Sequence, residues 1–481
     1  MTHSEFSTPP STAKTPTDSK GQLVNLPSQA QGSLSQLARL QEEALQLRTP
    51  EALVEFEEQA HRLVAAASHA CVAQALQAAV DSEAVQEAAA QLVQSLPRRY
   101  RLDEKRVTVN IRTSLGGIVA IKTPYYRQKG GSRRGRKPGL YPALVVLGIW
   151  DRCTPKLASD VSRAVAMLGS LEEARAHLLE MGIELDVKTI RSIAYRFAAR
   201  ARAAQQATAA TLVDNASGRR VVVSIDGGRV RVRRKKRGRK TKKGRNRYQA
   251  DWREPKLLII YVVGEDGRPL QSWASIIDGT LRGPDALVAL LELYLRQIQL
   301  NAAEKILFVA DGARWIWTRL SALIARLALQ PRQVLTLIDF YHAVQQLSDA
   351  AKLRCWKSGQ RKRWITKHAR LLRAGKLDRV IAALKELRQG RNAAKIGTHL
   401  RYFIRNRARF AYNRVRRFKL PMGSGAVESA IRRVINLRVK GPAIYWLKEN
   451  VEHILLLRSF YKSRRWKCLQ RFAYSAAGLQ M

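Results

Sequence analysis

The strongest constraint on the fold is a series of short apolar segments between residues 219 and 339, most of which end in an aspartate. Five segments have this character: VVVSID (221–226), LLIIYVVG (257–264), LQSWASIID (270–278), KILFVAD (305–311) and QVLTLID (333–339). Short apolar runs bounded by turn residues predict buried β-strands. The amphipathic stretch at 284–300 predicts a helix between the third strand and the fourth. Three successive strands, followed by alternating helices and strands, predict a mixed sheet in an α/β domain.

The rest of the chain divides by composition into regions with different expected structures. Residues 1–32 are rich in Ser, Thr, Pro, Gln and Gly, which predicts a disordered tail. Residues 33–96 predict an acidic helical segment, either for packing and self-association or as an ordinary solvated subdomain. Residues 97–210 predict a small β-hairpin and helix-turn-helix DNA-binding region. Residues 211–481 form the predicted α/β domain, with an all-helical insertion at 343–420.

Two local patterns define the region 97–210. Segments 106–112 and 118–127 carry alternating or β-branched residues around a Gly-Gly pair, which predicts a β-hairpin. Residues 155–204 are helical in pattern, and Asp186 is a candidate N-cap for the last helix. Two short helices, a glycine-containing turn and a basic helix predict a helix-turn-helix, although a basic helix also fits a solvated surface.

Charge is the second constraint, because the chain holds 86 Lys and Arg against 38 Asp and Glu, a formal net charge of +48. Residues 33–96 hold 3 basic and 9 acidic side chains, so the positive excess lies beyond them. Residues 351–420 alone hold 23 basic and 2 acidic side chains. Such a surplus repels itself, which predicts a polyanionic partner, with DNA or RNA first.

The densest basic run, residues 229–247, holds 13 Lys or Arg among 19 residues between the first two predicted strands. It must therefore form a loop or a long hairpin close to Asp226. We expect this segment to hold DNA, although a disordered run that binds any polyanion fits the same sequence. The predicted DNA-binding residues here are Arg229, Arg231, Arg233, Arg234, Lys235, Lys236 and Arg237.

Three acidic residues are the candidates for chemistry. Asp226 and Asp311 each end an apolar strand and precede glycine, and such strand ends face the ligand crevice of an α/β sheet. One Asp-Gly alone more often forms a turn, but two from separate strands of one sheet favour a ligand site. Glu428 follows Gly423-Ser424-Gly425 in the first turn of a predicted helix, where a capping glutamate would look the same.

These three carboxylates suit divalent metal ions. Hard oxygen ligands favour Mg²⁺ or Mn²⁺ over zinc. Two such ions about 4 Å apart activate the attacking oxygen and stabilise the leaving oxygen during in-line displacement at phosphorus. The sequence therefore predicts two-metal phosphoryl transfer, with Asp226, Asp311 and Glu428 as the metal ligands.

Five segments together resemble a known family. They are SIDGGRVRVR, DWREPKLLIIYVV, FVADGARWIW, LIDFYHAVQQL and GSGAVESAIRRVINLRVKG. They are similar to the bacterial insertion-sequence DDE transposases of the Kra type, which are related to the Mutator-like transposases and have an RNase H-like catalytic domain. The resemblance runs from about Val107 to Trp466 and implies an RNase H-like mixed sheet.

The resemblance also implies roles for individual residues. Asp226, Asp311 and Glu428 match the catalytic acids of the family. Asp339 and His342 match its D-x-x-H signature, so His342 either orients a carboxylate or contacts the scissile phosphate, although a structural histidine fits equally. Arg438, Lys440 and Trp446 lie in the stretch that follows the glutamate, where basic side chains beside an aromatic ring suit DNA ends; Trp446 also fits a core position.

The implied activity is that of a DNA transposase. It binds the terminal inverted repeats of its element, cleaves there and transfers the 3′-hydroxyl to target DNA. Two ends must be handled together, so a homodimer or a higher oligomer is expected. The alternatives are a catalytically inactive, transposase-derived DNA-binding protein and an RNase H-like nuclease that only hydrolyses. Relatives carry a cysteine cluster after the equivalent of Tyr125-Tyr126, which is absent here, so a zinc ribbon is not expected.

The cell compartment follows from weaker signals. Cys71, Cys153, Cys355 and Cys468 are too far apart in sequence for a disulfide scaffold or a zinc motif. The N-terminal segment lacks the apolar core of a secretory signal, and no membrane span or membrane partner is expected. We therefore expect a cytoplasmic protein associated with the bacterial nucleoid.

Overall fold

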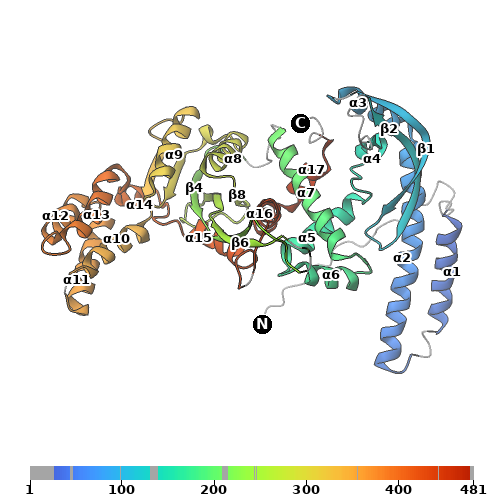
Figure 1. The fold of residues 1–481 in the computed structure, drawn as a ribbon, viewed down its shortest axis with the longest axis horizontal. Helices are drawn as coiled ribbons and strands as arrows, with labels where there is room; N and C mark the ends of the chain where they lie inside the picture. The colour runs from blue at the N-terminus through green and yellow to red at the C-terminus, as the bar shows by residue number, and fades with distance from the viewer. Residues whose placement is uncertain are drawn as a thin grey trace, which may run out of the picture. The chain divides into compact units, whose positions relative to one another are not determined.

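The computed structural model describes residues 26–43, 47–97, 99–129, 139–207, 215–242, 244, 246–354, 356–442 and 444–476 (Figure 1). The chain divides into two compact units, Met1–Leu157 (unit 1) and Ala158–Met481 (unit 2). Most of the predicted disordered tail lies outside the described residues. The end of that tail is corrected: the first helix begins at Ser28, whereas the prediction extends the tail to Gly32. The reason is that Ala30 is fully buried in a small apolar cluster with Ala67.

Unit 1 combines helices with a β-hairpin. Its helices are α1 (Ser28–Glu43), α2 (Pro50–Asp81), α3 (Glu83–Ser95) and α4 (Pro142–Val146), and its strands are β1 (Tyr100–Arg112), β2 (Ile118–Gln128) and β3 (Gly139–Leu140). The predicted helices and the predicted hairpin are therefore confirmed. Helix α2 begins where the Thr49 hydroxyl accepts a hydrogen bond from Ala52 N at 3.1 Å, a common N-terminal cap.

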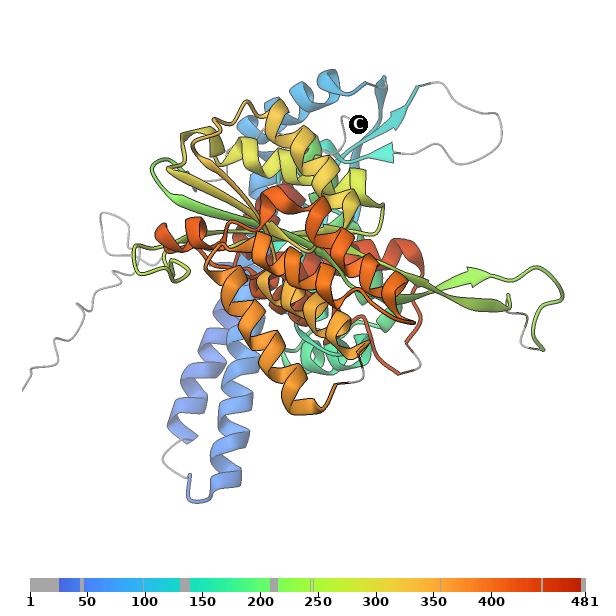
Figure 2. The same cartoon turned by 90° about the vertical axis from the view of Figure 1, so that its left-hand side faces the viewer.

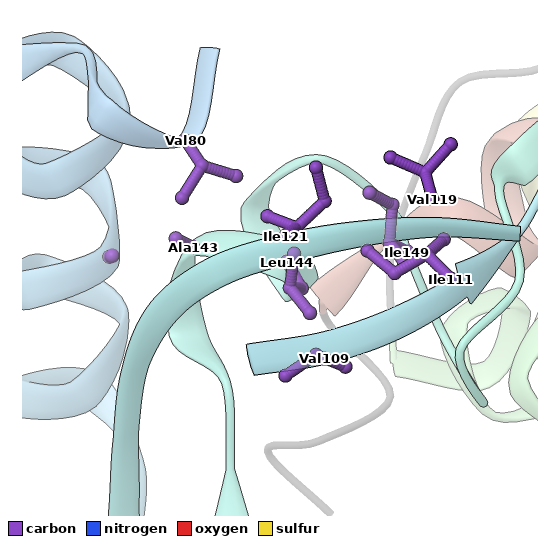
Figure 3. Close-up of a cluster of buried hydrophobic side chains, with 9 residues drawn as sticks. Val80, Val109, Ile111, Val119, Ile121, Ala143, Leu144 and Ile149 are labelled. Carbon is purple, nitrogen blue, oxygen red and sulfur yellow. The ribbon is translucent and has the colours of Figure 1, made fainter. Parts of the chain in front are cut away.

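The core of unit 1 lies against the hairpin. Val109, Ile111, Val119 and Ile121 are buried, because every second residue of each strand faces inward. They share one apolar cluster with residues of the neighbouring helices and of the segment after α4, which are Val80, Ala89, Ala143, Leu144 and Ile149 (Figure 3). This burial fixes the register of β1 against β2.

Helix α2 is the element that bears on the expectation that the chain has no membrane span. In the described part of the chain it is the one helix whose length and hydropathy would suffice, with an 18-residue window of mean hydropathy 1.5. One such helix is weak support for a span. In unit 1, α2 packs beside α1, and Gln77 exchanges hydrogen bonds of 2.8 and 3.0 Å with the backbone of Lys122 on β2.

Unit 2 contains a five-stranded sheet, a two-stranded hairpin and most of the helices. The sheet strands are β4 (Arg220–Gly227), β7 (Lys256–Val263), β8 (Ile276–Thr280), β9 (Lys305–Ala310) and β10 (Val334–Ile338). Their order across the sheet is β10-β9-β4-β7-β8. Strands β9 and β10 run parallel to β4, and β7 runs antiparallel to both of its neighbours. The predicted α/β class with a mixed sheet is confirmed.

The third predicted strand is displaced. The prediction places it at 270–278, whereas β8 covers Ile276–Thr280. Chain geometry explains the shift. Gly267 has a positive φ of 83° in the turn after β7, and Pro269 has no N–H to donate to a ladder. Trp273 N donates to Leu270 O in a further turn, so the strand starts later.

The helices before the sheet are α5 (Pro155–Met167), α6 (Leu171–Glu180) and α7 (Val187–Ala207). They match the three helices of the predicted helix-turn-helix, and Asp186 accepts hydrogen bonds from Lys188 N and Thr189 N as the predicted cap. Apart from the first residues of α5, they belong to unit 2 with the sheet. Whether they bind DNA stays a prediction.

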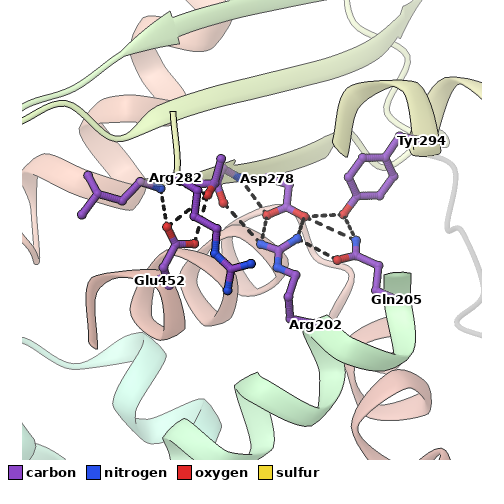
Figure 4. Close-up of polar contacts among 9 residues, drawn as sticks. Arg202, Gln205, Asp278, Arg282, Tyr294 and Glu452 are labelled. Carbon is purple, nitrogen blue, oxygen red and sulfur yellow. Dashed lines mark hydrogen bonds and ion pairs between the residues drawn. The ribbon is translucent and has the colours of Figure 1, made fainter. Parts of the chain in front are cut away.

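A buried polar network ties α7 to the edge of the sheet. Arg202 donates to both carboxylate oxygens of Asp278 on β8, at 2.7 and 2.8 Å (Figure 4). Tyr294 of α8 (Pro284–Gln297) donates to the same carboxylate at 2.6 Å. A bidentate, charge-assisted pair is geometrically selective, so α7 is held at a defined position on β8.

The remaining helices follow the sheet strands. They are α9 (Arg314–Arg326), α10 (Phe340–Lys352), α11 (Ser358–Arg373), α12 (Leu377–Leu387), α13 (Ala393–Arg405), α14 (Tyr412–Arg417), α15 (Gly425–Ile431), α16 (Lys448–Lys462) and α17 (Trp466–Tyr474), with the short 3₁₀ turns η2 (Leu300–Ala302) and η3 (Arg407–Arg409) and the π-helical turn η4 (Arg432–Asn436). The predicted helical insertion at 343–420 corresponds to α10–α14.

The basic segment forms a hairpin. Strands β5 (Val230–Lys235) and β6 (Tyr248–Arg253) pair antiparallel, and Figure 2 shows them reaching away from the sheet of unit 2. The long-hairpin alternative for residues 229–247 is therefore confirmed for the strands, and the second strand extends beyond the predicted segment. The division of the chain into the four predicted regions stays a prediction.

Candidate active site

Three aspartates lie in register at the carboxyl ends of three neighbouring parallel strands. Asp226 lies at the end of β4, Asp311 follows β9 and Asp339 follows β10. The pairing of the three strands, continued by one or two residues, places Asp226 beside Asp311 and Asp311 beside Asp339. Asp339 N donates to Ala310 O at 2.8 Å, so the ladder does continue there. Parallel strands thus bring acids from distant sequence positions to one edge of the sheet.

Asp226 is partly buried, and its Oδ1 accepts a hydrogen bond from Gly227 N at 2.6 Å. Burial raises the pKa of Asp226 to about 6, and the negative charges of Asp311 and Glu428 add to the rise. His342 acts in the opposite direction through its positive charge. The Asp226 carboxylate therefore lies within electrostatic reach of both other predicted catalytic acids.

Asp311 sits at the turn into α9. Its Oδ1 accepts a hydrogen bond from Ala313 N at 2.9 Å. The next residue is glycine for a steric reason, because a Cβ on Gly312 would lie 2.1 Å from the ring of Tyr402 on α13. The helical insertion therefore packs directly against the strand end that carries Asp311.

Glu428 approaches the sheet from α15. A Cβ on Gly228 would lie 2.7 Å from the side chain of Ile435, so the helical segment after Glu428 packs closely on the residues that follow Asp226. Across the residues that the structure describes, the Glu428 carboxylate accepts no capping hydrogen bond. Its side chain is exposed, and a carboxylate oxygen lies within 4.8 Å of ligand atoms of Asp339 and His342. This geometry favours a ligand role over the capping alternative.

Asp339 is fully buried, and both of its carboxylate oxygens accept hydrogen bonds. Its Oδ1 accepts from His342 N at 2.8 Å, and its Oδ2 accepts from both the hydroxyl, at 2.6 Å, and the backbone N of Ser424. Burial alone would raise the pKa of Asp339, but these contacts hold it well below its usual range. Because its oxygens are already used, Asp339 fits an anchor between β10, α10 and the turn before Glu428 better than a metal ligand.

His342 lies between these acids. Its Nδ1 is 3.5 Å from Asp339 Oδ1, which is an electrostatic contact and too long for a good hydrogen bond. The Asp339 carboxylate raises the pKa of His342 to about 9, against the effect of burial, and Asp311 and Glu428 contribute. The imidazole is therefore a cation at neutral pH within a cluster of carboxylates.

The residues present fit divalent metal ions. Asp226, Asp311 and Glu428 offer hard carboxylate oxygens that make few hydrogen bonds of their own, and burial, to which the charges of Asp311 and Glu428 add, raises the pKa of Asp226. Among the described residues, Asp339, His342 and Glu428 are the group whose ligand atoms all lie within 4.8 Å of one another, close enough to share one ion. By ligand chemistry alone, the hard oxygens of Asp226, Asp311 and Glu428 suit Mg²⁺ or Mn²⁺.

Two residues at the site escape sequence reasoning. Lys256, at the start of β7 opposite Gly227, is buried, pairs with Glu254 at 2.5 Å and places Nζ 4.4 Å from the ring centre of Trp315. Tyr341 is 71% exposed next to His342. The sequence signal for Tyr341 is its position two residues after Asp339, whereas Lys256 comes near Asp226 only through the pairing of β4 with β7.

The predicted DNA-binding residues fall into two groups. Arg229, Arg233, Arg234, Lys235, Lys236, Arg237 and Lys440 are exposed, and Arg231 is partly exposed. Arg438 is buried with its guanidinium 5.3 Å from the ring centre of Trp446, whose Nε1 donates to Val439 O at 2.9 Å. This geometry favours the core-packing alternative for Trp446 over contact with DNA ends. No disulfide joins the described cysteines Cys71, Cys153 and Cys468.

Comparisons with known protein families, with characterised proteins and with solved structures find no match to this chain.

Proposed function

We propose that the protein is a DNA transposase of the DDE type. The observation that carries this proposal is the convergence of Asp226 and Asp311 on adjacent strand ends with Glu428, which is close enough to affect the pKa of Asp226. The strand order β10-β9-β4-β7-β8, with β7 antiparallel, supports an RNase H-like catalytic domain. The helical insertion between β10 and α15 lies where the proposed relatives carry theirs.

The chain's own residues have distinct parts in the proposed mechanism. Asp226, Asp311 and Glu428 would hold two Mg²⁺ or Mn²⁺ ions, which supply activation of the attacking oxygen and stabilisation of the leaving oxygen. Asp339 holds the turn before Glu428 through Ser424, so the glutamate keeps its direction. His342, as a cation, offsets part of the negative charge that the acids and a scissile phosphate bring together.

The partner in this proposal is DNA: the terminal inverted repeats of the element and a target. The positive excess and the exposed basic hairpin β5–β6 support backbone binding. Handling two ends together calls for a homodimer or a higher oligomer. A cytoplasmic, nucleoid-associated location is part of the same proposal.

The decisive experiment is a strand-transfer assay. Labelled duplexes are made from the DNA that flanks the coding sequence, and products are followed with plasmid target in Mg²⁺, in Mn²⁺ and in EDTA. We expect joined products only with a divalent ion and none with Asp226→Asn or Asp311→Asn. Asp266→Asn, an identical change on an exposed turn, is the matched control and should remain active.

The outcomes separate the three functions. Hydrolysis without joining would replace the transposase by an RNase H-like nuclease. Specific binding without any cleavage in either metal would indicate a transposase-derived DNA-binding protein. Full activity of Asp226→Asn would reject the assignment of the catalytic acids.

A further inference from the structure

The hairpin β5–β6 has two different faces. Strand pairing places Arg231 opposite Trp252 and Lys235 opposite Tyr248. Residues directly opposite one another share a face, so one face carries cations and aromatic rings. The other face starts with the buried Val230 and Val232, which attach the base of the hairpin to unit 2.

Aromatic rings and guanidinium groups alternate along the first face. The Arg231 Cζ lies 5.6 Å from the ring centre of Trp252 and 4.7 Å from that of Tyr445. The rings of Tyr445 and Tyr248 are 5.7 Å apart, and the Arg233 Cζ lies 4.8 Å from the Tyr248 ring centre. These five residues, Trp252, Arg231, Tyr445, Tyr248 and Arg233, are called the ladder face below.

Backbone hydrogen bonds hold the ladder face together. Arg233 N donates to Trp446 O at 2.7 Å, and Trp446 N donates to Arg231 O at 3.0 Å. The segment that contains Tyr445 therefore pairs with β5 through one parallel bridge, between Val232 and Trp446. The cations and rings are thus presented from a fixed backbone, which lowers the cost of ordering them when a ligand binds.

Two aromatic rings of the ladder face are exposed to solvent over about half of their surface. Trp252 is 55% exposed and Tyr248 is 43% exposed. Leaving large rings in water is unfavourable, and exposed apolar surface surrounded by charge commonly marks a binding site. A ligand that covers it must offer flat apolar faces to the rings and negative charge to the surrounding Arg and Lys side chains.

Unpaired nucleotides have this chemistry, whereas a duplex keeps its base faces stacked inside. Aromatic platforms with interleaved cations bind single strands through base stacking and phosphate contacts. We propose that the ladder face binds single-stranded nucleic acid by stacking unpaired bases on Trp252 and Tyr248. This deepens the proposed function, on which the choice of DNA rests: the hairpin starts at Val230, four residues beyond Asp226, so a strand freed at the active site is near the ladder face.

Fluorescence anisotropy in EDTA tests the proposal without any cleavage. The probes are labelled oligo(dT), the matching oligo(U) and a mixed-sequence duplex of equal length. We expect Trp252→Ala and Tyr248→Ala each to weaken oligo(dT) binding about 5- to 100-fold, while duplex binding changes less than about twofold. Trp252→Phe keeps a stacking ring and should retain most of the oligo(dT) affinity.

Matched variants make the result decisive. Lys236→Ala and Arg237→Ala, which remove exposed cations of the same hairpin, should weaken single-strand and duplex binding alike. Equal losses on both probes with Trp252→Ala, or unchanged oligo(dT) binding, would overturn the proposal and leave the rings a purely structural role. Stronger loss on oligo(U) than on oligo(dT) would assign the face to RNA.

Failure of this proposal and failure of the transposase assignment can be told apart. Asp266→Asn, on an exposed turn outside the ladder face and the candidate active site, should bind oligo(dT) as the natural protein does. A 2-aminopurine base in the oligonucleotide should lose fluorescence on binding, as stacked bases do, and recover it with Trp252→Ala. Failure of strand transfer alone therefore leaves this proposal standing, and failure of stacking alone leaves the catalytic acids standing.

Discussion

Asp226 and Asp339 flank Asp311 on either side, yet their surroundings have opposite effects. Burial and neighbouring negative charge raise the pKa of Asp226 to about 6, whereas hydrogen bonds from His342 and Ser424 overcome burial and hold that of Asp339 low. One carboxylate is destabilised in the folded chain and the other is stabilised. A residue kept in an unfavourable environment at a strand end is a common mark of a functional site.

Asp226→Asn should stabilise the metal-free protein. An acid whose folded pKa lies above its unfolded value contributes stability below about pH 4 and loses it as the pH rises through about 6. At pH 7 the substitution removes that penalty, at most about 3 kcal/mol for a carboxyl whose pKa is raised to about 6, so Tm should rise by a few degrees in EDTA and remain similar near pH 4. Thermal unfolding at both pH values measures this.

Asp339→Asn is the matched comparison and should have the opposite sign. Asparagine cannot accept from both groups of Ser424 and from His342 as well as a carboxylate does, so about 2–4 kcal/mol of stability should be lost at pH 7. A depressed folded pKa means that this contribution is present at all pH values above about 4. If both variants shift Tm in the same direction, the assigned environments are wrong.

Glu428→Gln should separate catalysis from folding. The exposed carboxylate accepts no capping hydrogen bond from the described residues, so Tm should change by less than a degree or two. Loss of one charge from a site for two divalent ions should lower strand transfer by about two orders of magnitude or more. Glu449→Gln, in the first turn of α16, is the control; equal activity of the two variants would place the third acid elsewhere.

The element that carries Glu428 is held by an unusual contact. Helix α15 continues into the π-helical turn η4, whose wider turn leaves carbonyls without their normal intrahelical partners. The buried side chain of Arg458 on α16 donates to Val434 O at 2.9 Å, to Arg433 O and to Ala166 O at 2.8 Å. Burial lowers the pKa of Arg458 to about 10, so it remains charged at neutral pH.

Arg458→Met should therefore destabilise unit 2. Methionine fills similar volume but leaves three buried or partly buried carbonyls without this donor, at about 1–3 kcal/mol for each. We expect the free energy of unfolding to fall by about 3 kcal/mol or more, measured by denaturant titration. Arg432→Met, on the exposed side of the same turn, should change it by less than about 0.5 kcal/mol.

At the scale of elements, the hydrophobic pattern of the sequence predicts the features that depend on residues close together in the chain. The runs that became β4, β7, β9 and β10 are buried apolar segments with clear ends, and the cap at Asp186 is a local contact. The start of β8 could not be predicted, because Leu270 and Trp273 are apolar like strand residues. In the structure, Trp273 N donates to Leu270 O in a turn. The role of Asp339 depends on Ser424, 85 residues away in the sequence, and no local pattern reveals such a partner.

At the scale of the molecule, the formal net charge of +48 should dominate the proposed binding of DNA. If about ten phosphates are bound by cationic side chains, log K should fall against log[salt] with a slope near −9. Titrations between low and physiological salt measure the slope. A flat response would contradict a role for the basic surface. Neutral variants of the β5–β6 hairpin should make the slope shallower by about one for each phosphate that the hairpin no longer neutralises.

The root of the hairpin β5–β6 also limits which insertions the sequence can accept during evolution. Three residues join Asp226 to Val230, and the middle one, Gly228, is packed against Ile435. An insertion there would rotate Arg231 and Arg233 to the opposite face, because side chains alternate along a strand. Lineages of this protein should therefore keep the root of the hairpin constant in length.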